Sequence, residues 1–347
     1  MSFQSEKRIV RAHMAAFDAA PLSELGTVLR ASAAPDYRWR GVHPFYELDG
    51  VAAVMRRFWL PLRKSITHLQ RREDIFFAGD NVVPPEEGLA SETGKAGVWT
   101  CSMGHFMGLL DHDWLGIPAT NKLVFLPYAE FHQVRDGQIA QTALFLDIIS
   151  VMQQAGRDPF PHQTGAPVVP RGPRTHDGVL LGDTPAGEGR LTLDLLARMI
   201  ADLDRYNRGV EQDYPREGLA NTWHEDMIWY GPAGIGTTYT IDRYQQQHQF
   251  PFRRQLTDKR FNGHVARIAE GDYAGWFGWP NLNNRNAGGF LGLPESDVSA
   301  EMRVVDIYRR DGDKLAENWV FIDLLHYLAQ HGIDLLSDPD AVIRARG

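Results

Sequence analysis

Residues 301–325, EMRVVDIYRRDGDKLAENWVFIDLL, decide the fold. They contain two runs rich in apolar residues, Glu301–Arg310 and Lys314–Leu325, which are joined by Asp311-Gly312-Asp313. An Asp-Gly dipeptide between two such runs is a strong signal of a β-hairpin. The sequence therefore predicts an antiparallel hairpin near the end of the chain.

The first half of the chain carries the same hairpin pattern, with Lys122–Arg135 joined through Asp136-Gly137 to Gln138–Ser150. Other short segments recur in the same order: Trp39-Arg40-Gly41 as Trp229-Tyr230-Gly231, Pro61-Leu62-Arg63-Lys64 as Pro251-Phe252-Arg253-Arg254, and Phe145-Leu146-Asp147 as Phe321-Ile322-Asp323. The first two matches have the same separation along the chain, and the last has a shorter one, because the first half has a longer insert at Asn81–Gly97. Ordered matches at a nearly fixed separation predict a duplicated domain.

Each half predicts the same order of elements. A helix opens it, Glu6–Ala19 or Leu191–Asn207, and a second helix follows near Val51–Leu62 or Ile241–Phe252. Strands then follow the helices, which is the order of an α+β fold. Between the halves, residues 156–190 are rich in Pro and Gly and lack any helical or strand period, which indicates a linker or wrapping segment. We expect a first domain at 1–155, a linker at 156–190 and a second domain at 191–347.

The composition restricts the class of protein. The chain has 347 residues, of which 43% are hydrophobic and 23% charged, and this is typical of a globular protein. The formal charge of −8 argues against a nucleic-acid partner. The single Cys101 excludes an intramolecular disulfide and a multi-cysteine metal site. The sequence shows no signal peptide and no apolar run of about 20 residues, so we expect a cytoplasmic chain with no membrane contact.

The last predicted strand of each half carries an aspartate, Asp323 or Asp147, in an apolar run. Alternation places Asp323 on the face of Trp319 and Phe321, so we expect it to face an aromatic cavity. Desolvation there would raise the carboxyl pKa toward the range useful for general acid–base catalysis. The alternative interpretation is an N-cap for a helix that begins near Leu324.

Polar residues also alternate on the neighbouring strand. Glu130 and His132 share a face in the first half, and Asp306 and Tyr308 share one in the second. A His–carboxylate pair beside Asp147 is one interpretation, and a satisfied or surface histidine is the other.

Two further histidines are candidates for chemistry. His248 lies in Gln245–Pro251, where the alternative is an exposed helix position. His105 lies in a strand between Gly104 and Gly108, which would let a ligand or another backbone approach closely.

These segments resemble the SnoaL-like polyketide cyclase family of the nuclear transport factor 2 superfamily. The second half carries the resemblance most clearly, in Trp229–Pro232, Gln247–Phe252, Gly292-Leu293-Pro294, Ala316–Asp323 and Gln330-His331-Gly332. The first half is similar but looser, with Gln141-Thr142-Ala143 in place of Glu317-Asn318-Trp319. The resemblance covers nearly the whole chain outside the linker.

The resemblance implies two tandem cone-shaped α+β domains, each with a curved antiparallel sheet wrapped around about three helices and a pocket between them. Characterised cyclases of this family close a polyketide ring by aldol chemistry without a metal or cofactor, using a pocket aspartate helped by a histidine. Asp323 and Asp147 match the strand-end position of that aspartate, and His248 and His105 are the candidate histidines. We therefore expect cofactor-free aldol cyclase, isomerase or dehydratase chemistry on a small hydrophobic carbonyl compound.

Six residues are candidates for contact with that ligand: Trp229, Tyr230, Trp279, Trp319, Glu130 and His132. For the aromatic members, ordinary core packing is the alternative. We expect the two copies to pack sheet against sheet, as a pseudo-dimeric monomer or within a homodimer.

Two other functions remain open from the sequence. This fold also serves in non-catalytic ligand-binding and scaffold proteins. Another branch of the superfamily hydrolyses epoxides, which would need an Asp–Arg–Asp set that activates water, and the sequence does not assemble such a set.

Overall fold

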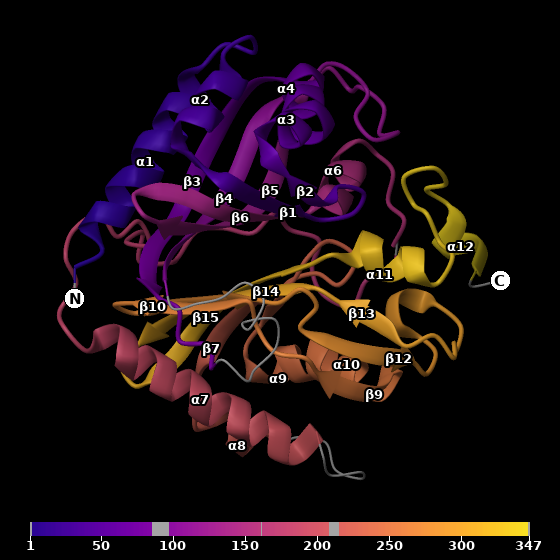
Figure 1. The fold of residues 1–347 in the computed structure, drawn as a ribbon. Helices are drawn as coiled ribbons and strands as arrows, with labels where there is room; N and C mark the ends of the chain where they lie inside the picture. Colours follow the sequence, from indigo (N-terminus) through magenta and orange to yellow (C-terminus); the bar gives the residue numbers. More distant parts are fainter. Residues whose placement is uncertain (1, 85–96, 161, 208–214, 346–347) are drawn as a thin grey trace.

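The computed structural model describes residues 2–84, 97–160, 162–207 and 215–345. Most of the insert at 81–97 therefore lies outside the described residues. In this structure the chain forms two α+β units whose sheets meet in the middle (Figure 1). Helices α1–α4 cover the face of the first sheet that points away from the second unit, and α7–α10 cover the equivalent face of the second sheet (Figure 1). We call this helix-covered face the inner face of each unit.

The first unit is built on one six-stranded sheet of order β2-β1-β6-β5-β4-β3. Its strands are β1 (Ala33–Gly41), β2 (Tyr46–Asp49), β3 (Ile66–Asp80), β4 (Val98–Leu110), β5 (Leu123–Arg135) and β6 (Gln138–Leu146). Its helices are α1 (Gln4–Ala19), α2 (Leu25–Ser32), α3 (Gly50–Val54), the π-helix η1 (Met55–Trp59), α4 (Leu60–Ser65) and α6 (Ile148–Gln154).

The second unit repeats this order with a sheet β10-β11-β14-β15-β7-β8 and a small sheet β13-β12-β9. Its strands are β7 (Trp223–Tyr230), β8 (Thr238–Tyr239), β9 (Leu256–Phe261), β10 (Ala266–Glu270), β11 (Tyr273–Phe277), β12 (Leu282–Asn286), β13 (Ala300–Met302), β14 (Val304–Asp311) and β15 (Lys314–Ile322). Its helices are α7 (Glu188–Asn207), α8 (Arg216–Ala220), α9 (Ile241–Tyr244), the π-helix η2 (Gln245–Gln249), α10 (Phe250–Gln255), the 3-10 helix η3 (Phe290–Gly292), α11 (Leu324–Gln330) and α12 (Ala341–Ala345).

The strand registers confirm the duplication. Arg71 pairs with Phe106 in the first unit, and Phe261 pairs with Leu282 in the second. Phe261 follows Arg71 at the longer of the two repeat separations, and Leu282 follows Phe106 at the shorter, so the two pairs are equivalent. Three long strands of the first unit are each divided in two in the second, and this division creates the small sheet. The predicted α+β architecture is confirmed with one refinement. Each six-stranded sheet is mixed, because β1 runs parallel to β6 and β7 runs parallel to β15.

The segment after β1 and β7 is held by the same close contact in both units. A Cβ atom on Gly41 would lie 2.1 Å from the ring of Trp39, and one on Gly231 would lie 2.0 Å from the ring of Trp229. No side chain fits at this distance, so each tryptophan requires a glycine two residues later. This contact explains why the Trp-x-Gly pattern recurs in the sequence.

Each sheet has two faces with different partners. The inner face meets the unit's own helices, as shown by the contact of Trp39 with Phe58 of η1, with ring centroids 4.9 Å apart. The interface side meets the other unit, where Phe277 contacts Trp99, Phe131 and Phe145 at centroid distances of 5.0–6.0 Å. The expected sheet-against-sheet packing of the two copies is therefore present.

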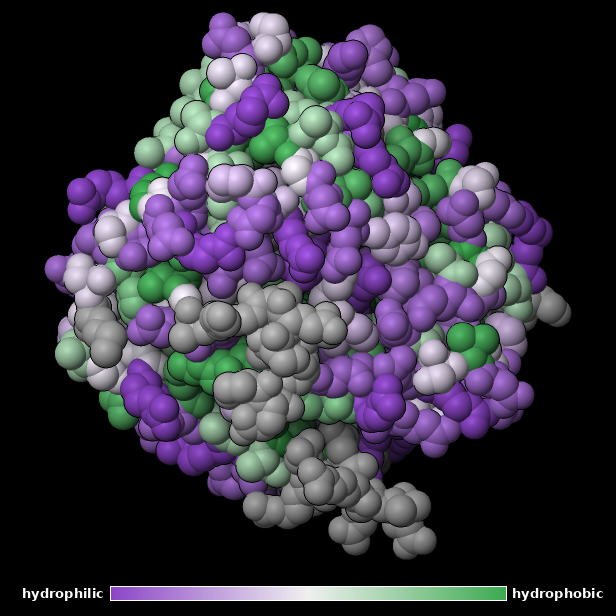
Figure 2. Space-filling view, in the orientation of Figure 1, coloured by the Kyte–Doolittle hydropathy of each residue, from purple (hydrophilic) through white to green (hydrophobic). Residues whose placement is uncertain are grey.

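Residues of the Pro/Gly-rich segment lie against both units. Gly178 and Leu180 bond to the backbone of Phe76 in β3, and Gly165 and Ala166 bond to the loop that follows β7. The segment is therefore packed along the molecule as a wrapping segment. No helix within the described ranges has the length and apolar character needed to span a bilayer. On the face shown in Figure 2, hydrophilic side chains predominate and hydrophobic ones form separate patches.

Candidate functional site

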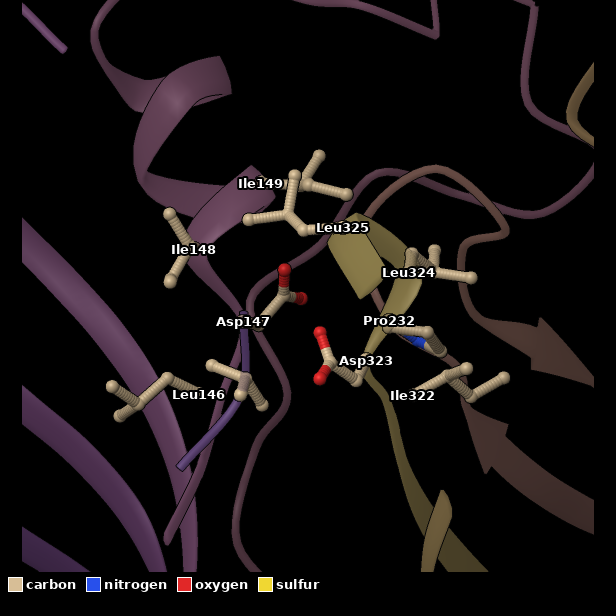
Figure 3. A pocket seen from close by; sticks show the side chains of 10 residues that line it. Leu146, Asp147, Ile148, Ile149, Pro232, Ile322, Asp323, Leu324 and Leu325 are labelled. Atoms are coloured by element: carbon tan, nitrogen blue, oxygen red, sulfur yellow. The ribbon is translucent and has the colours of Figure 1, made fainter. Parts of the chain in front are cut away.

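The two strand-end aspartates lie opposite one another where the units meet. Asp147 and Asp323 line the same small pocket, with their carboxylates turned toward each other (Figure 3). Asp147 accepts hydrogen bonds from Ser150 N at 3.0 Å and from Ala233 N of the second unit at 2.8 Å. The arrangement is reciprocal, because Asp323 accepts from His326 N at 3.1 Å and from His43 N of the first unit at 3.0 Å.

Each aspartate is therefore the N-cap of the following helix, α6 or α11, which is the alternative that the sequence offered. Burial raises the pKa of Asp323 to about 6, against the opposing effect of Arg303, and burial also raises the pKa of Asp147. Asp323 does share a face with Trp319 and Phe321, but that face is the interface side of the sheet. Alternation could not tell which side of a doubly covered strand would face a pocket. The catalytic role of these aspartates stays a prediction.

Three of the aromatic candidates lie on the interface side as well. Tyr230 and Trp319 stack with ring centroids 5.8 Å apart, and Trp319 Nε1 donates to Arg171 O of the wrapping segment. Trp279 contacts Phe145 of the first unit at a centroid distance of 5.7 Å. His105 also contacts the wrapping segment, through Nε2 and Pro170 O at 2.7 Å.

The inner face of the first unit carries a buried ion network. Arg71 lies between two carboxylates, 2.7 Å from Glu130 and 3.1 Å from Asp18. His132 Nε2 is 3.5 Å from Glu130, so these two residues lie together as expected, but on the inner face and not beside Asp147, which lies where the units meet. Burial would raise the pKa of Glu130, but the charges of Arg71 and His132 outweigh this effect and hold it well below its usual value. Glu130 is only 3% exposed, and this carboxylate stays ionised and covered.

The second unit has Asp306 at the position equivalent to Glu130, at the shorter of the two repeat separations. Its carboxylate accepts hydrogen bonds from Trp276 Nε1 at 3.1 Å and from Tyr308 OH at 3.2 Å, and both donors are neutral. Burial raises the pKa of Asp306 to about 6. Asp306 and Asp311 are the partly exposed residues of β14, whose other members are buried. Asp306 is therefore a carboxyl that burial desolvates in large part and that remains partly exposed.

The sequence did not single out Asp306 as a candidate. The sequence shows its alternation with Tyr308. It does not show that Glu130, the equivalent residue of the first unit, pairs with Arg71, whereas no cation in the described part of the chain pairs with Asp306. The signal that could have found Asp306 is the residue equivalent to Arg71 in the second unit. Arg71 of the first unit corresponds to Phe261, which ends β9 and is 58% exposed.

His248 lies on the same inner face. Its imidazole stacks on the indole of Trp229 with centroids 3.8 Å apart and planes 18° apart. Among the described residues it makes ring contacts and no hydrogen bond. Burial lowers the pKa of His248 to about 3, so the imidazole is neutral at pH 7. The first unit has Phe58 at this position, at the longer of the two repeat separations.

Strand register connects the imidazole with the carboxyl. Trp229, which carries His248 on its ring, pairs with Asn318 across β7 and β15, and Asn318 pairs with Tyr308 across β15 and β14. The Tyr308 hydroxyl donates to Asp306. The inner face of the second unit therefore carries a neutral imidazole and a protonatable carboxyl, with aromatic side chains between them.

A groove with about 460 Å³ of empty space opens beside His248. It lies between η2 and α10 on one side and η3 with residues 162–164 on the other. No group of three or more His, Cys, Asp or Glu among the described residues is arranged to hold a metal ion.

The sequence matches no family model and no curated protein. Solved structures are similar to about two fifths of it. A proposed SnoaL-like polyketide cyclase from Jannaschia sp. CCS1 is 17% identical, with 44% of this chain and 94% of that chain covered and a TM-score of 0.33. A nuclear transport factor 2-like protein from Burkholderia xenovorans LB400 is 14% identical, with 41% and 96% covered and a TM-score of 0.32. IdmH, a proposed polyketide cyclase from Streptomyces antibioticus, is 19% identical, with 41% and 99% covered and a TM-score of 0.31.

Their names belong to the family and superfamily that the sequence resembles. These likenesses concern the fold, and the two-unit architecture itself rests on the strand registers described above. The protein is a chain of two tandem α+β units. The inner face of the first unit has a buried carboxylate, Glu130, and the inner face of the second has a partly exposed carboxyl, Asp306.

Proposed function

We propose that the protein is a cofactor-free acid–base enzyme that moves a proton on a small hydrophobic carbonyl compound, and that Asp306 carries the proton. The observation that supports the proposal is the environment of Asp306, a partly exposed carboxyl with neutral hydrogen-bond donors. A carboxyl with a pKa near 6 is a useful base and acid at neutral pH, because both of its forms are populated.

The aromatic surroundings suit a hydrophobic substrate. Trp276 and Tyr308 contact one another at a centroid distance of 5.0 Å beside the carboxyl, and Trp223 contacts Tyr308 at 6.0 Å. Such walls exclude water from a carbonyl compound and keep the carboxyl desolvated. Removal of a proton next to a carbonyl group by Asp306 would give an enolate, and return of the proton to a different carbon would complete an isomerisation. For a ring closure, the enolate carbon would instead attack a second carbonyl carbon of the same molecule, and the resulting alkoxide would take the proton back from Asp306.

His248 supplies the second role in this proposal. A neutral imidazole donates a hydrogen bond to a developing oxyanion without adding a charge to an apolar site. The stack on Trp229 fixes the ring plane, and the absence of a described hydrogen-bond partner leaves both ring nitrogens for a ligand. Asp306 and His248 thus take the acid–base and assisting roles that the family resemblance gave to an aspartate and a histidine.

The assay is exchange of the α-protons of 2-tetralone with deuterium oxide, followed by NMR. Asp306→Asn should lower the exchange rate by about 10²–10⁴-fold, the usual contribution of a positioned general base. Asp313→Asn is the matched control, because it removes the same charge from the exposed hairpin between β14 and β15. Wild-type exchange should rise with pH through about 6 and then level off, since the base must be ionised.

Two outcomes would overturn the proposal. Exchange that survives in Asp306→Asn but is lost in Asp323→Asn would return the acid–base role to the strand-end aspartate. Ligand binding without exchange in the wild-type protein, for 2-tetralone and for other hydrophobic ketones, would favour the non-catalytic binding function.

A further inference from the structure

We propose that the groove beside His248 is a binding subsite for an uncharged, flat, ring-containing molecule that carries one hydrogen-bonding oxygen, and that the wrapping segment forms one of its walls. This inference rests on the proposed function, since it names the class of compound that His248 would face. It shares His248 with the proposed acid–base step and adds the groove walls, which that step does not use.

The chemistry of the lining sets the charge of the ligand. The groove is lined by apolar side chains such as Phe252 and Phe290, by amide and hydroxyl side chains, and by the imidazoles of His162 and His248. Its lining has no Asp, Glu, Lys or Arg. The lining itself offers no ionic partner that would offset the lost hydration of a charged ligand. The nearby cation is Lys259, which lies outside the lining with Nζ 5.1 Å from the centroid of the Phe252 ring, and burial lowers its pKa to about 8. An uncharged ligand loses much less, so the lining favours uncharged molecules.

The shape of the groove favours a flat ring. The ring of His248 contacts Phe252 at a centroid distance of 5.6 Å, and Phe252 contacts Phe290 at 6.3 Å. These rings form one aromatic wall that continues from the stacked Trp229.

The unpartnered imidazole supplies the polar contact. His248 has no hydrogen bond among the described residues, and its ring borders the groove. A neutral imidazole offers one donor and one acceptor nitrogen. A hydroxyl or carbonyl oxygen on the ligand satisfies either of them, whereas a pure hydrocarbon satisfies neither.

The opposite wall comes from residues that the two single units would not supply on their own. Gly234 N donates to Gln163 Oε1 at 3.0 Å, and the Thr164 hydroxyl donates to Gln247 O of η2. The next residues of the segment bond to the loop after β7, which holds this wall in place. The segment that joins the two copies therefore takes part in shaping the ligand site of the second copy.

Isothermal titration calorimetry on the full-length protein tests the proposal with three ligands of similar shape. 2-Naphthol should bind, and naphthalene-2-sulfonate and naphthalene should each bind roughly tenfold more weakly or not at all. Gln247→Lys places a cation on the groove wall and should weaken 2-naphthol binding by roughly tenfold. Gln246→Lys, at the exposed neighbouring position, is the matched control and should leave binding unchanged.

A second variant, Leu291→Trp, fills the groove and should also weaken binding, with circular dichroism melting to show that each variant is folded. Equal binding of the sulfonate, binding that is insensitive to both groove variants, or no binding of 2-naphthol would each overturn the subsite. Asp306→Asn should still bind 2-naphthol, so a failure of the acid–base proposal and a failure of the subsite give different results.

Discussion

The inner faces of the two units have equivalent strand pairings, but their buried carboxyl groups have different electrostatic environments. Glu130 and Asp306 occupy equivalent positions, opposite Leu144 and Val320 in their sheets. In the first unit Arg71 keeps the carboxylate charged, buried and paired. In the second unit the equivalent residue is Phe261, and the carboxyl has neutral donors and a raised pKa. The difference between Arg71 and Phe261 at one position thus distinguishes a structural ion pair in the first unit from a carboxyl suited to proton transfer in the second.

The division of the strands explains how the second unit loses the cation. In the first unit β3 continues through Arg71, which places the guanidinium over the rings of Phe106 and Tyr128 at 4.9 and 5.1 Å. In the second unit β9 ends at Phe261 and the strand resumes as β10. The side chain at this position is largely exposed and uncharged, and its ring contacts His264 at a centroid distance of 5.1 Å. The same duplication therefore yields one closed and one accessible acidic site.

The largest expected effect comes from removing the cation of the first unit. Arg71→Met leaves the buried Glu130 with only His132 nearby and removes the cation beside the partly buried Asp18, and we expect a loss of about 3–5 kcal/mol in the free energy of unfolding. Urea titration at pH 7 measures it. The equivalent change in the second unit, Phe261→Ala, should stay within about 0.5 kcal/mol because that side chain is exposed. Adding Glu130→Gln to Arg71→Met should recover part of the loss, and no recovery would contradict the ion-pair interpretation.

A smaller effect is expected from Asp306, and it depends on pH. The pKa is about 6 in the folded chain against an ordinary value of 3.8, so the folded state holds the proton more tightly. The stability that this proton gives is fully present below pH 3.8 and is lost as pH rises to about 6. The shift of roughly two pKa units corresponds to about 3 kcal/mol.

Asp306→Asn removes this dependence. Between pH 4 and pH 7, the free energy of unfolding of the variant should rise relative to that of the wild type by up to about 3 kcal/mol. Urea titration at each pH measures this difference. Asp323 titrates in the same range, so the difference between the two proteins, rather than either curve, isolates Asp306. A difference that stays constant across this range would show that the carboxyl is not desolvated in solution.

The sequence could predict the fold because the signals were local. The Asp-Gly hairpins, the helix spacing and the ordered repeats predict two α+β copies, and the structure has them. It could also predict that Glu130 and His132 share a face. It could not show that the apolar face of Asp323 packs against another sheet, because periodicity reports burial and not the identity of the neighbour. Nor could it find Asp306, whose properties depend on the absence of a cation contributed by a different strand.

The smallest expected effect concerns the two crossed helix caps, and it bears directly on where the chemistry lies. Asp147→Ala and Asp323→Ala should each lower the free energy of unfolding by about 1 kcal/mol, as is usual for the loss of an N-cap. Asp323→Ala should cost more than Asp147→Ala, because Arg303 lies 3.8 Å from Asp323 and would lose this carboxylate. Differential scanning calorimetry measures both. If the caps are structural, 2-tetralone exchange should follow the folded fraction in both variants. A loss of exchange in folded Asp323→Ala alone would place the proton transfer at the interface and would assign the inner face of the second unit to binding.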